Sequence, residues 1–296
     1  MSFPGAPSRP VIVITGATHG IGHAAAIELA RRGARLGLVA RSEAKARTTR
    51  ADIERAAPGT PVDVFLADLS AQADVRRVAR ELDHAYDRID VLVNNAGLHA
   101  FEQRITADGL PEMVAVNYLA PWLLTHCLRD KLVASAPCRI VNVASDAHRN
   151  VRVLDPARHL CSTQAFTGRE SSEHYARSKL MDILFTQELA RRLAGTGVTA
   201  NACCPGLNAS GLGRESKGFT RLAALFNRVG LFRPEKGARI LVRLARDPAL
   251  EGVTGEFFST VRLFQAFPPA PMRQDRELQR RLWEATAALV GEGVSP

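Results

Sequence analysis

The sequence lacks the features of a membrane-bound or secreted protein. No apolar run approaches the roughly 20 residues that cross a bilayer, and the start, MSFPGAPSRP, is rich in Pro and Gly and unlike a signal peptide. The cysteines, odd in number, show neither a CxxC pair nor the His/Cys spacing of a zinc site. We therefore expect a soluble, cytoplasmic protein with reduced cysteines, no metal and no membrane contact.

Clusters of positive charge are also missing, although the chain is basic overall. Lys and Arg outnumber Asp and Glu by 39 to 30, and a basic surface can attract nucleic acid or acidic lipid. The arginines are spread along the whole length, however, and no Lys/Arg run is interleaved with aromatic residues. This pattern favours a solvated basic surface that also draws in an anionic cofactor, and it argues against a nucleic-acid partner.

The sequence does contain a regular alternation of short apolar runs and longer amphipathic segments. Nearly continuous apolar strands separated by helices are typical of a parallel sheet covered on both faces. We predict one Rossmann-type α/β domain over residues 11–296, a doubly wound sheet of about seven strands, with a flexible segment at 1–10 and a C-terminal helix near 275–290. The expected strands are residues 11–14, 35–40, 62–67, 89–94, 139–145, 198–204 and 255–259.

Two segments interrupt this alternation. Residues 146–174 are polar and irregular, and residues 206–234 hold Gly, Ser, Arg and the short apolar piece LAALF. Both follow the carboxyl ends of expected strands. Because ligands of open α/β sheets bind beyond these ends, we predict that the two segments form the walls of a substrate pocket.

A glycine-rich turn, TGATHGIG, joins the first expected strand to the following helix. Glycines in this context permit a tight turn, a close approach of the backbone to a pyrophosphate and close helix packing, while the helix N-terminus attracts the phosphates. We predict a dinucleotide site whose turn is formed by Gly16, Thr18, His19, Gly20, Ile21 and Gly22.

The end of the second expected strand, VARS, bears on the choice of dinucleotide. NAD-binding folds commonly place an acidic residue here to bind the ribose 2′-hydroxyl, whereas this chain has Arg41. A guanidinium can bind a 2′-phosphate through paired hydrogen bonds. We predict NADP(H) as the cofactor; the alternative is that Arg41 is an ordinary surface residue.

The segment YARSK places Tyr175 one helical turn before Lys179. An ammonium on the same helix face favours the phenolate and lowers the tyrosine pKa from its usual value of about 10. A shift of about three units, equivalent to roughly 4 kcal/mol, would suit Tyr175 to general acid–base catalysis near neutral pH. Tyr175 and Lys179 alone are weak evidence for a catalytic site, because this spacing occurs by chance in many helices.

Several motifs accompany that pair in a fixed order: TGATHGIG, NNAG at 94–97, the asparagine of VNYLAPWLLT, Ser145 at a strand end, and YARSK. Together they resemble the short-chain dehydrogenase/reductase family over nearly the whole chain. The segments DGLPEMVAVNYLAPWLLT, VNVASDAHR and LWEATAALVG resemble its retinol-dehydrogenase-like branch most closely.

The resemblance implies a role for each catalytic residue. Tyr175 would protonate the substrate oxygen as hydride reaches carbon, or accept that proton in the reverse direction. Ser145 would hold the oxygen by a hydrogen bond. Lys179 would bind the nicotinamide ribose as well as tune Tyr175, and Asn117 would hold a water that links Lys179 to solvent. These roles are coherent because hydride transfer to a carbonyl creates an alkoxide that needs donors and a proton.

Further cofactor contacts also follow from the resemblance. They are Asp68 and Leu69 near the adenine, Asn95, Ala96 and Gly97 of the NNAG motif, and Pro205, Gly206 and Ser210 of PGLNAS. Asn94 would support the central sheet. In PGLNAS, Ser210 stands where the family often has Thr, and Asn208 replaces an aliphatic residue, which leaves the geometry of this loop open.

Three histidines and two tryptophans are expected to have structural roles. His148, His159 and His174 flank the site in sequence, yet an isolated loop histidine is more often a surface or packing residue. Trp122 and Trp283 are expected to pack in the interior, although Trp283, on the C-terminal helix, could also cover the pocket.

The leading hypothesis is an NADPH-dependent carbonyl reductase acting on a ketone or aldehyde of low polarity, with an aromatic or polycyclic metabolite as a candidate substrate. The alternative within the same family is an alcohol or retinol-type dehydrogenase working in the oxidative direction. A retinoid is disfavoured because the start lacks a membrane anchor.

A non-catalytic NADP(H)-sensing regulator is a further alternative, which the presence of Ser145, Tyr175 and Lys179 opposes. The resemblance also leads us to expect a homodimer or homotetramer.

Overall fold

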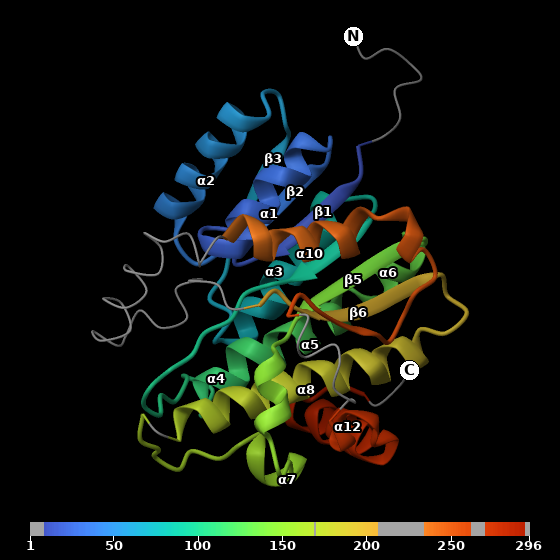
Figure 1. Ribbon diagram of the computed structural model, residues 1–296. Coiled ribbons are helices and arrows are strands. Elements are labelled where there is room, and N and C mark those ends of the chain that lie inside the picture. Colours follow the sequence, from blue (N-terminus) through green and yellow to red (C-terminus); the bar gives the residue numbers. More distant parts are fainter. Residues whose placement is uncertain (1–8, 169, 207–233, 262–269, 294–296) are drawn as a thin grey trace.

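The computed structural model of the chain describes residues 9–168, 170–206, 234–261 and 270–293. Its centre is a seven-stranded sheet in the order β3-β2-β1-β4-β5-β6-β7, in which every adjacent pair is parallel. This arrangement confirms the predicted doubly wound fold (Figure 1). The strands are β1 (Val11–Thr15), β2 (Arg35–Ala40), β3 (Val62–Leu66), β4 (Val91–Asn94), β5 (Cys138–Val143), β6 (Val198–Cys204) and β7 (Phe257–Ser259).

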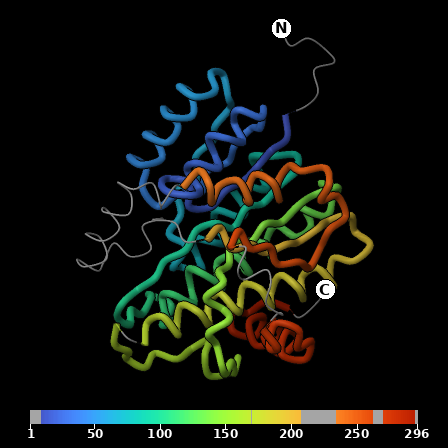
Figure 2. The backbone as a smooth tube through the Cα atoms, in the orientation of Figure 1, coloured from blue at the N-terminus to red at the C-terminus, as the bar shows by residue number. Residues whose placement is uncertain are grey.

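Helices cover both faces of the sheet, as nearly continuous apolar strands require. On one face, a core cluster joins the strands to α1 (Gly20–Arg31), α2 (Glu43–Ala56) and α10 (Pro234–Arg246). On the other, a larger cluster joins them to α3 (Gln72–Ala85), α5 (Ala120–Cys127), α8 (Ser171–Arg192) and α12 (Arg276–Val290). Figure 2 shows α12, in red, lying beside α8, in yellow.

The expected elements are found with small changes at their ends. The run at 139–145 is strand only to Val143, because Ser145 accepts a hydrogen bond from Ala147 N and begins the 3-10 helix η2 (Asp146–Asn150). The C-terminal helix begins at Arg276, where the Asp275 side chain accepts from Leu278 N at 2.9 Å.

The two predicted insertions differ in how far they can be followed. The first contains η2 and the short helix α7 (Pro156–His159), and leads into α8. The second lies outside the described residues except for Gly206 and Pro234. Shorter helical pieces complete the described chain: α4 (Glu112–Val114), the π-helix η1 (Ala115–Leu119), α6 (Arg129–Ala134), η3 (Pro248–Leu250) and η4 (Pro271–Gln274).

Within the described ranges, no helix combines the length and apolarity that a bilayer crossing requires.

Candidate active site

Most of the predicted cofactor residues lie along one edge of the sheet, just beyond the carboxyl ends of successive strands. Since all strands are parallel, these ends form a common edge where ligands of such folds bind. Gly16 follows β1, Arg41 follows β2, Asp68 and Leu69 follow β3, Asn95, Ala96 and Gly97 follow β4, and Pro205 and Gly206 follow β6. Ser210 lies outside the described residues.

The glycine-rich turn has the backbone that the sequence predicts. Gly16 and Gly20 have φ values of +69° and +60°, which favour glycine over residues with a side chain. A Cβ on Gly22 would lie 2.6 Å from Gly16 O and 2.4 Å from Asn95 Nδ2, so the first turn of α1 can approach the loop only without a side chain. Half-buried Thr18, exposed His19 and buried Ile21 complete the turn.

The NNAG segment holds this turn in place. Asn95 Nδ2 donates to Thr15 O at 2.9 Å and to Gly16 O at 3.1 Å, and Thr15 Oγ1 accepts from the backbone N–H groups of Asn95 and Ala96. Asn94 lies in the core, where its amide donates to Asn142 Oδ1 at 2.8 Å across β4 and β5. Asn94 therefore supports the sheet as predicted.

Arg41 and Asp68 lie at the adjoining strand ends. Arg41 is exposed directly after β2. Two residues earlier, Val39 O accepts a hydrogen bond from Gly16 N at 3.1 Å, which links the end of β2 to the glycine-rich turn. Asp68 accepts hydrogen bonds from Ser70 N and Ser70 Oγ. Both positions are compatible with contacts to the adenosine half of a dinucleotide.

The catalytic candidates come from β5 and α8. Tyr175 is partly exposed in the first turns of α8, and Ser145, two residues after β5, is close enough to hydrogen bond to its phenol. Lys179, buried one turn later, donates from Nζ to Val143 O at 2.7 Å. The structure thus brings Ser145, Tyr175 and Lys179 together at the edge that carries the glycine-rich turn.

Asn117 approaches the same cluster from the π-helix η1, a form of helix that is frequent at functional sites. A Cβ on Gly97 would lie 3.3 Å from Asn117 Oδ1 and 3.6 Å from Lys179 Nζ, which shows that the two side chains converge there. The Asn117 amide bonds to Leu98 N, Leu98 O and Ser178 Oγ. These contacts fix Asn117 beside Lys179; the bridging water stays a prediction.

The predicted lowering of the Tyr175 pKa is wrong for this structure. Burial raises the pKa of Tyr175, and although Lys179 and the Ser145 hydrogen bond lower it, Cys204 and Asp182 also raise it, so that the net shift is upward. The prediction considered Lys179 alone. Neither the desolvation of the phenol nor the nearby carboxylate was included.

Three residues beside the catalytic groups were missed or underrated. His99 stacks on the Tyr175 ring, with the ring centroids 4.7 Å apart. His148 is fully buried and its Nδ1 lies 2.8 Å from Ser145 O, which confirms a structural role and shows that it supports Ser145. Asp182 contacts Lys179 at 2.9 Å. The i, i+4, i+7 spacing of Tyr175, Lys179 and Asp182 was the available signal.

The other two histidines of this region make structural contacts. His174 stacks on Phe166, with centroids 4.3 Å apart, and His159 Nδ1 accepts from Asp155 N in α7. No group of three or more His, Cys, Asp or Glu residues suited to a metal ion occurs in the part of the chain that the structure describes.

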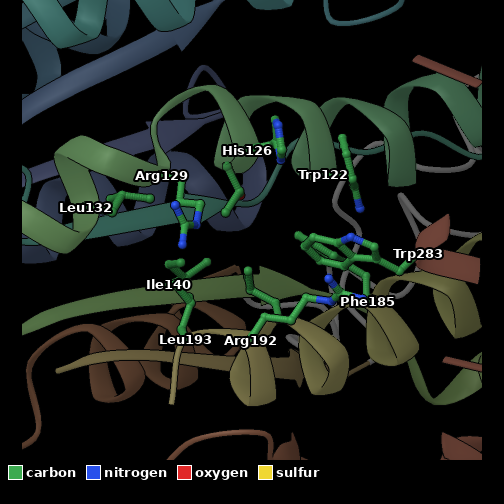
Figure 3. Close-up of a pocket in the computed structure, with 11 residues that line it drawn as sticks. Trp122, His126, Arg129, Leu132, Ile140, Phe185, Arg192, Leu193 and Trp283 are labelled. Carbon is green, nitrogen blue, oxygen red and sulfur yellow. The ribbon is translucent and has the colours of Figure 1, made fainter. Parts of the chain in front are cut away.

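A separate apolar groove lies between α5 and α8, where Trp122 and Trp283 are in contact (Figure 3). Trp283 packs against Phe185, further along α8 than Tyr175, and Arg192 lies 4.6 Å from its ring centroid. Trp283 is therefore a packing residue, as expected, and in the described structure its side chain lines this groove.

Taken together, the geometry suits transfer of hydride between a dinucleotide and a C–O group. The sheet edge offers a glycine-rich turn and a helix N-terminus for the pyrophosphate. At the same edge, two hydroxyls and a buried ammonium gather near the end of β5, which is the donor set that an alkoxide or carbonyl oxygen needs.

Comparison with known proteins agrees with this class. A family model described as short chain dehydrogenase matches residues 10–155, and human retinol dehydrogenase 13 is 37% identical over 96% of this chain and 85% of its own length. The chain belongs to the short-chain dehydrogenase/reductase family, whose members are oxidoreductases acting on CH–OH and C=O groups with NAD(P)(H).

Other relatives give the same family. Human retinol dehydrogenase 11 is 38% identical over 95% of this chain and 86% of its own length. A crystal structure of an uncharacterized protein from Mycobacterium paratuberculosis has a TM-score of 0.75 and 27% identity, covering 98% of this chain and 96% of that one. Actinorhodin polyketide ketoreductase with NADPH has a TM-score of 0.66 and 25% identity, covering 85% and 95%.

Proposed function

We propose that this protein is an NADP(H)-dependent dehydrogenase that interconverts an apolar, retinol-type alcohol and its carbonyl compound. The observation that carries the substrate class is the 37% identity, over 96% of the chain, to a protein named retinol dehydrogenase. This reverses the order of the two hypotheses that the sequence favours, in which carbonyl reduction leads and a retinoid substrate is disfavoured.

The chain's own residues act on the substrate oxygen. Tyr175 donates its phenolic proton to that oxygen when a carbonyl is reduced, and accepts the proton when an alcohol is oxidised. Ser145 hydrogen bonds to the same oxygen, and Lys179 provides a fixed positive charge beside the phenol. The bound nicotinamide supplies or accepts the hydride.

The preference for NADP(H) rests on Arg41. Its exposed side chain follows β2 at the edge that carries the glycine-rich turn, in the position where a carboxylate would select NAD. The structurally similar ketoreductase was solved with NADPH. We expect Arg41→Asp to raise the KM for NADPH far more than the KM for NADH. Equal effects on the two would remove Arg41 from this role.

A second candidate function is reduction of a ketone. It is favoured by the similarity to actinorhodin polyketide ketoreductase, at 25% identity and a TM-score of 0.66. Because Tyr175, Ser145 and Lys179 would serve both oxidation and reduction, only a comparison of substrates can decide between the two candidate functions.

The test is turnover by the purified chain, followed at the nicotinamide absorbance. Retinol with NADP⁺, retinal with NADPH, and a panel of ketones and quinones with NADPH are compared. The proposal predicts higher kcat/KM for the retinol–retinal pair than for the ketones. Tyr175→Phe should lower kcat by roughly 10²-fold or more while NADPH binding, measured by fluorescence, persists. Full activity of that variant, or no turnover of any alcohol or carbonyl by the wild type, would contradict the proposal.

A further inference from the structure

Helix α8 carries a buried ion pair next to the catalytic tyrosine. Lys179 Nζ and Asp182 Oδ2 lie 2.9 Å apart, and the two side chains are only 4% and 2% exposed. Lys179 also donates to Val143 O at 2.7 Å. Tyr175, Lys179 and Asp182 follow the i, i+4, i+7 spacing of one helix face. The carboxylate therefore pairs with the buried ammonium on the helix face that also carries the partly exposed phenol of Tyr175.

The Asp182 carboxylate is charged at neutral pH and is paired with the Lys179 ammonium. Burial raises the pKa of Asp182 to about 6 and Lys179 opposes the rise, so the group is ionised at pH 7. Burial alone would lower the pKa of Lys179, but Asp182 and Tyr175 outweigh it and raise it overall. Asp182 Oδ1 is buried and has no hydrogen-bond partner among the described residues.

The buried phenol and thiols on the neighbouring elements carry no charge at neutral pH. Tyr118 of η1 and Cys203 and Cys204 of β6 all have pKa values raised by burial, so they are neutral at pH 7. Asp146 interacts with Cys204, and His99 stacks on the face of the Tyr175 ring. Lys179 lowers the pKa of Tyr175 and Asp182 raises it, so the two members of the ion pair act on the phenol in opposite directions.

We propose that Asp182 is a positioning residue of the active site: it holds the Lys179 ammonium in place and cancels part of the positive charge that Lys179 presents to Tyr175. The inference rests on the proposed function only in taking Tyr175 as the proton-transferring group.

The consequence is a change in the charge of the cluster when the phenol ionises. With Asp182 present, Lys179 and Asp182 sum to zero, so loss of the Tyr175 proton leaves a buried net negative charge. Without the carboxylate, the same loss takes the cluster from positive to neutral. Ionisation is easier in the second case, because a low-dielectric site disfavours net charge.

Asp182→Asn tests this directly, because the amide keeps the shape and an acceptor for Lys179 while removing the charge. The full chain is saturated with NADP⁺ and tyrosinate absorbance is followed against pH. Subtracting a Tyr175→Phe variant made in the same background, wild type or Asp182→Asn, isolates residue 175 from Tyr86 and from Tyr118, whose pKa Asp182 also raises. We expect the Tyr175 midpoint to fall by roughly one pH unit in Asp182→Asn.

A control on the same helix is Glu188→Gln, which makes the same chemical change at a carboxylate paired with Arg191 and Arg192. Its midpoint should equal that of the wild type. Should Asp182→Asn fold poorly by thermal unfolding, Asp182→Ser removes the same charge and must shift the midpoint in the same direction.

The outcomes separate the two proposals. An unchanged Tyr175 midpoint in the folded Asp182 variants overturns the inference, even if the wild type oxidises retinol. Failure of the wild type to bind NADP⁺ overturns the proposed function instead. As a second readout, reductive kcat/KM should begin to fall at lower pH in Asp182→Asn, whereas a merely structural role for Asp182 would lower kcat at every pH without moving the profile.

Discussion

Single residues show how burial changes the chemistry that a motif implies. Tyr175 and Lys179 were recognisable from YARSK, but the direction of the tyrosine pKa was not, because the sequence does not show that burial and Asp182 oppose the ammonium. In reduction, Tyr175 must be protonated, so activity is retained below its pKa and lost above it. A raised pKa therefore keeps the phenol protonated at neutral pH.

His148 gives a prediction for stability against pH. Burial lowers its pKa to about 4 from 6.5, so the unfolded chain binds the proton more tightly than the folded one, and stability is lost as pH falls from about 6.5 towards 4. Between pH 7 and pH 5, titration of His148 should lower the free energy of unfolding by roughly 2 kcal/mol.

The control for this pH dependence is His148→Asn, whose side chain stays neutral and can still donate a hydrogen bond to Ser145 O. Urea unfolding at the two pH values should show a smaller loss of the free energy of unfolding in the variant than in the wild type. The same loss in both would show that His148 does not titrate on unfolding as described.

At the scale of elements, the junction of β1, its glycine-rich turn and α1 was predicted most completely. Turn chemistry is local, so Gly16, Gly20 and Gly22 could be predicted from the sequence, and the positive φ of the first two and the close contact at Gly22 agree. The end of β5 was less predictable. The run VNVAS gives no clear end point, and in the structure the strand ends at Val143, two residues before Ser145 accepts a hydrogen bond from Ala147 N.

Gly22→Ala should disturb this junction by steric conflict alone. Its Cβ would meet Gly16 O at 2.6 Å, and overpacking of this kind costs about 1–3 kcal/mol. We expect lower stability and a raised Kd for NADPH, because the turn that holds the pyrophosphate must shift.

Gly33→Ala is the matched control at the other end of α1. Its Cβ would meet nothing within 4 Å, although φ is +82°, so it should cost about 1–2 kcal/mol and leave NADPH affinity unchanged. Equal Kd values for the two variants, measured by fluorescence titration, would show that Gly22 is not needed for the cofactor.

On the scale of the whole molecule, the doubly wound parallel sheet and the C-terminal helix were predictable, but the packing of that helix was not. The periodicity of residues 275–290 indicates a helix without indicating its partner. The structure places α12 on α8, where Trp283 is 5% exposed and contacts Trp122 and Phe185. Contacts between segments so distant in sequence depend on the complete fold. The loop containing Asn208 and Ser210 lies outside the described residues.

Trp283→Ala should therefore weaken the whole fold. Removing a buried tryptophan costs about 3–5 kcal/mol, and the loss should appear as a lower free energy of unfolding in urea. At low temperature kcat/KM should be retained, since Trp283 packs against Trp122, Phe185 and Arg192. Exposed Arg281→Ala, two residues earlier, should change stability by less than about 0.5 kcal/mol. Similar effects of the two substitutions would contradict the assigned packing.

The central claim is that Tyr175, Ser145 and Lys179 surround the reacting carbon of a nicotinamide bound at the carboxyl edge of the sheet. A crystal structure with NADP⁺ and an unreactive alcohol analogue tests it most directly. The account predicts the pyrophosphate on the turn from Gly16 to Gly22, the nicotinamide ribose within hydrogen-bond distance of Lys179, and the analogue's oxygen bonded to both hydroxyls. A nicotinamide ring bound away from Tyr175, with the alcohol in contact with neither hydroxyl, would contradict it.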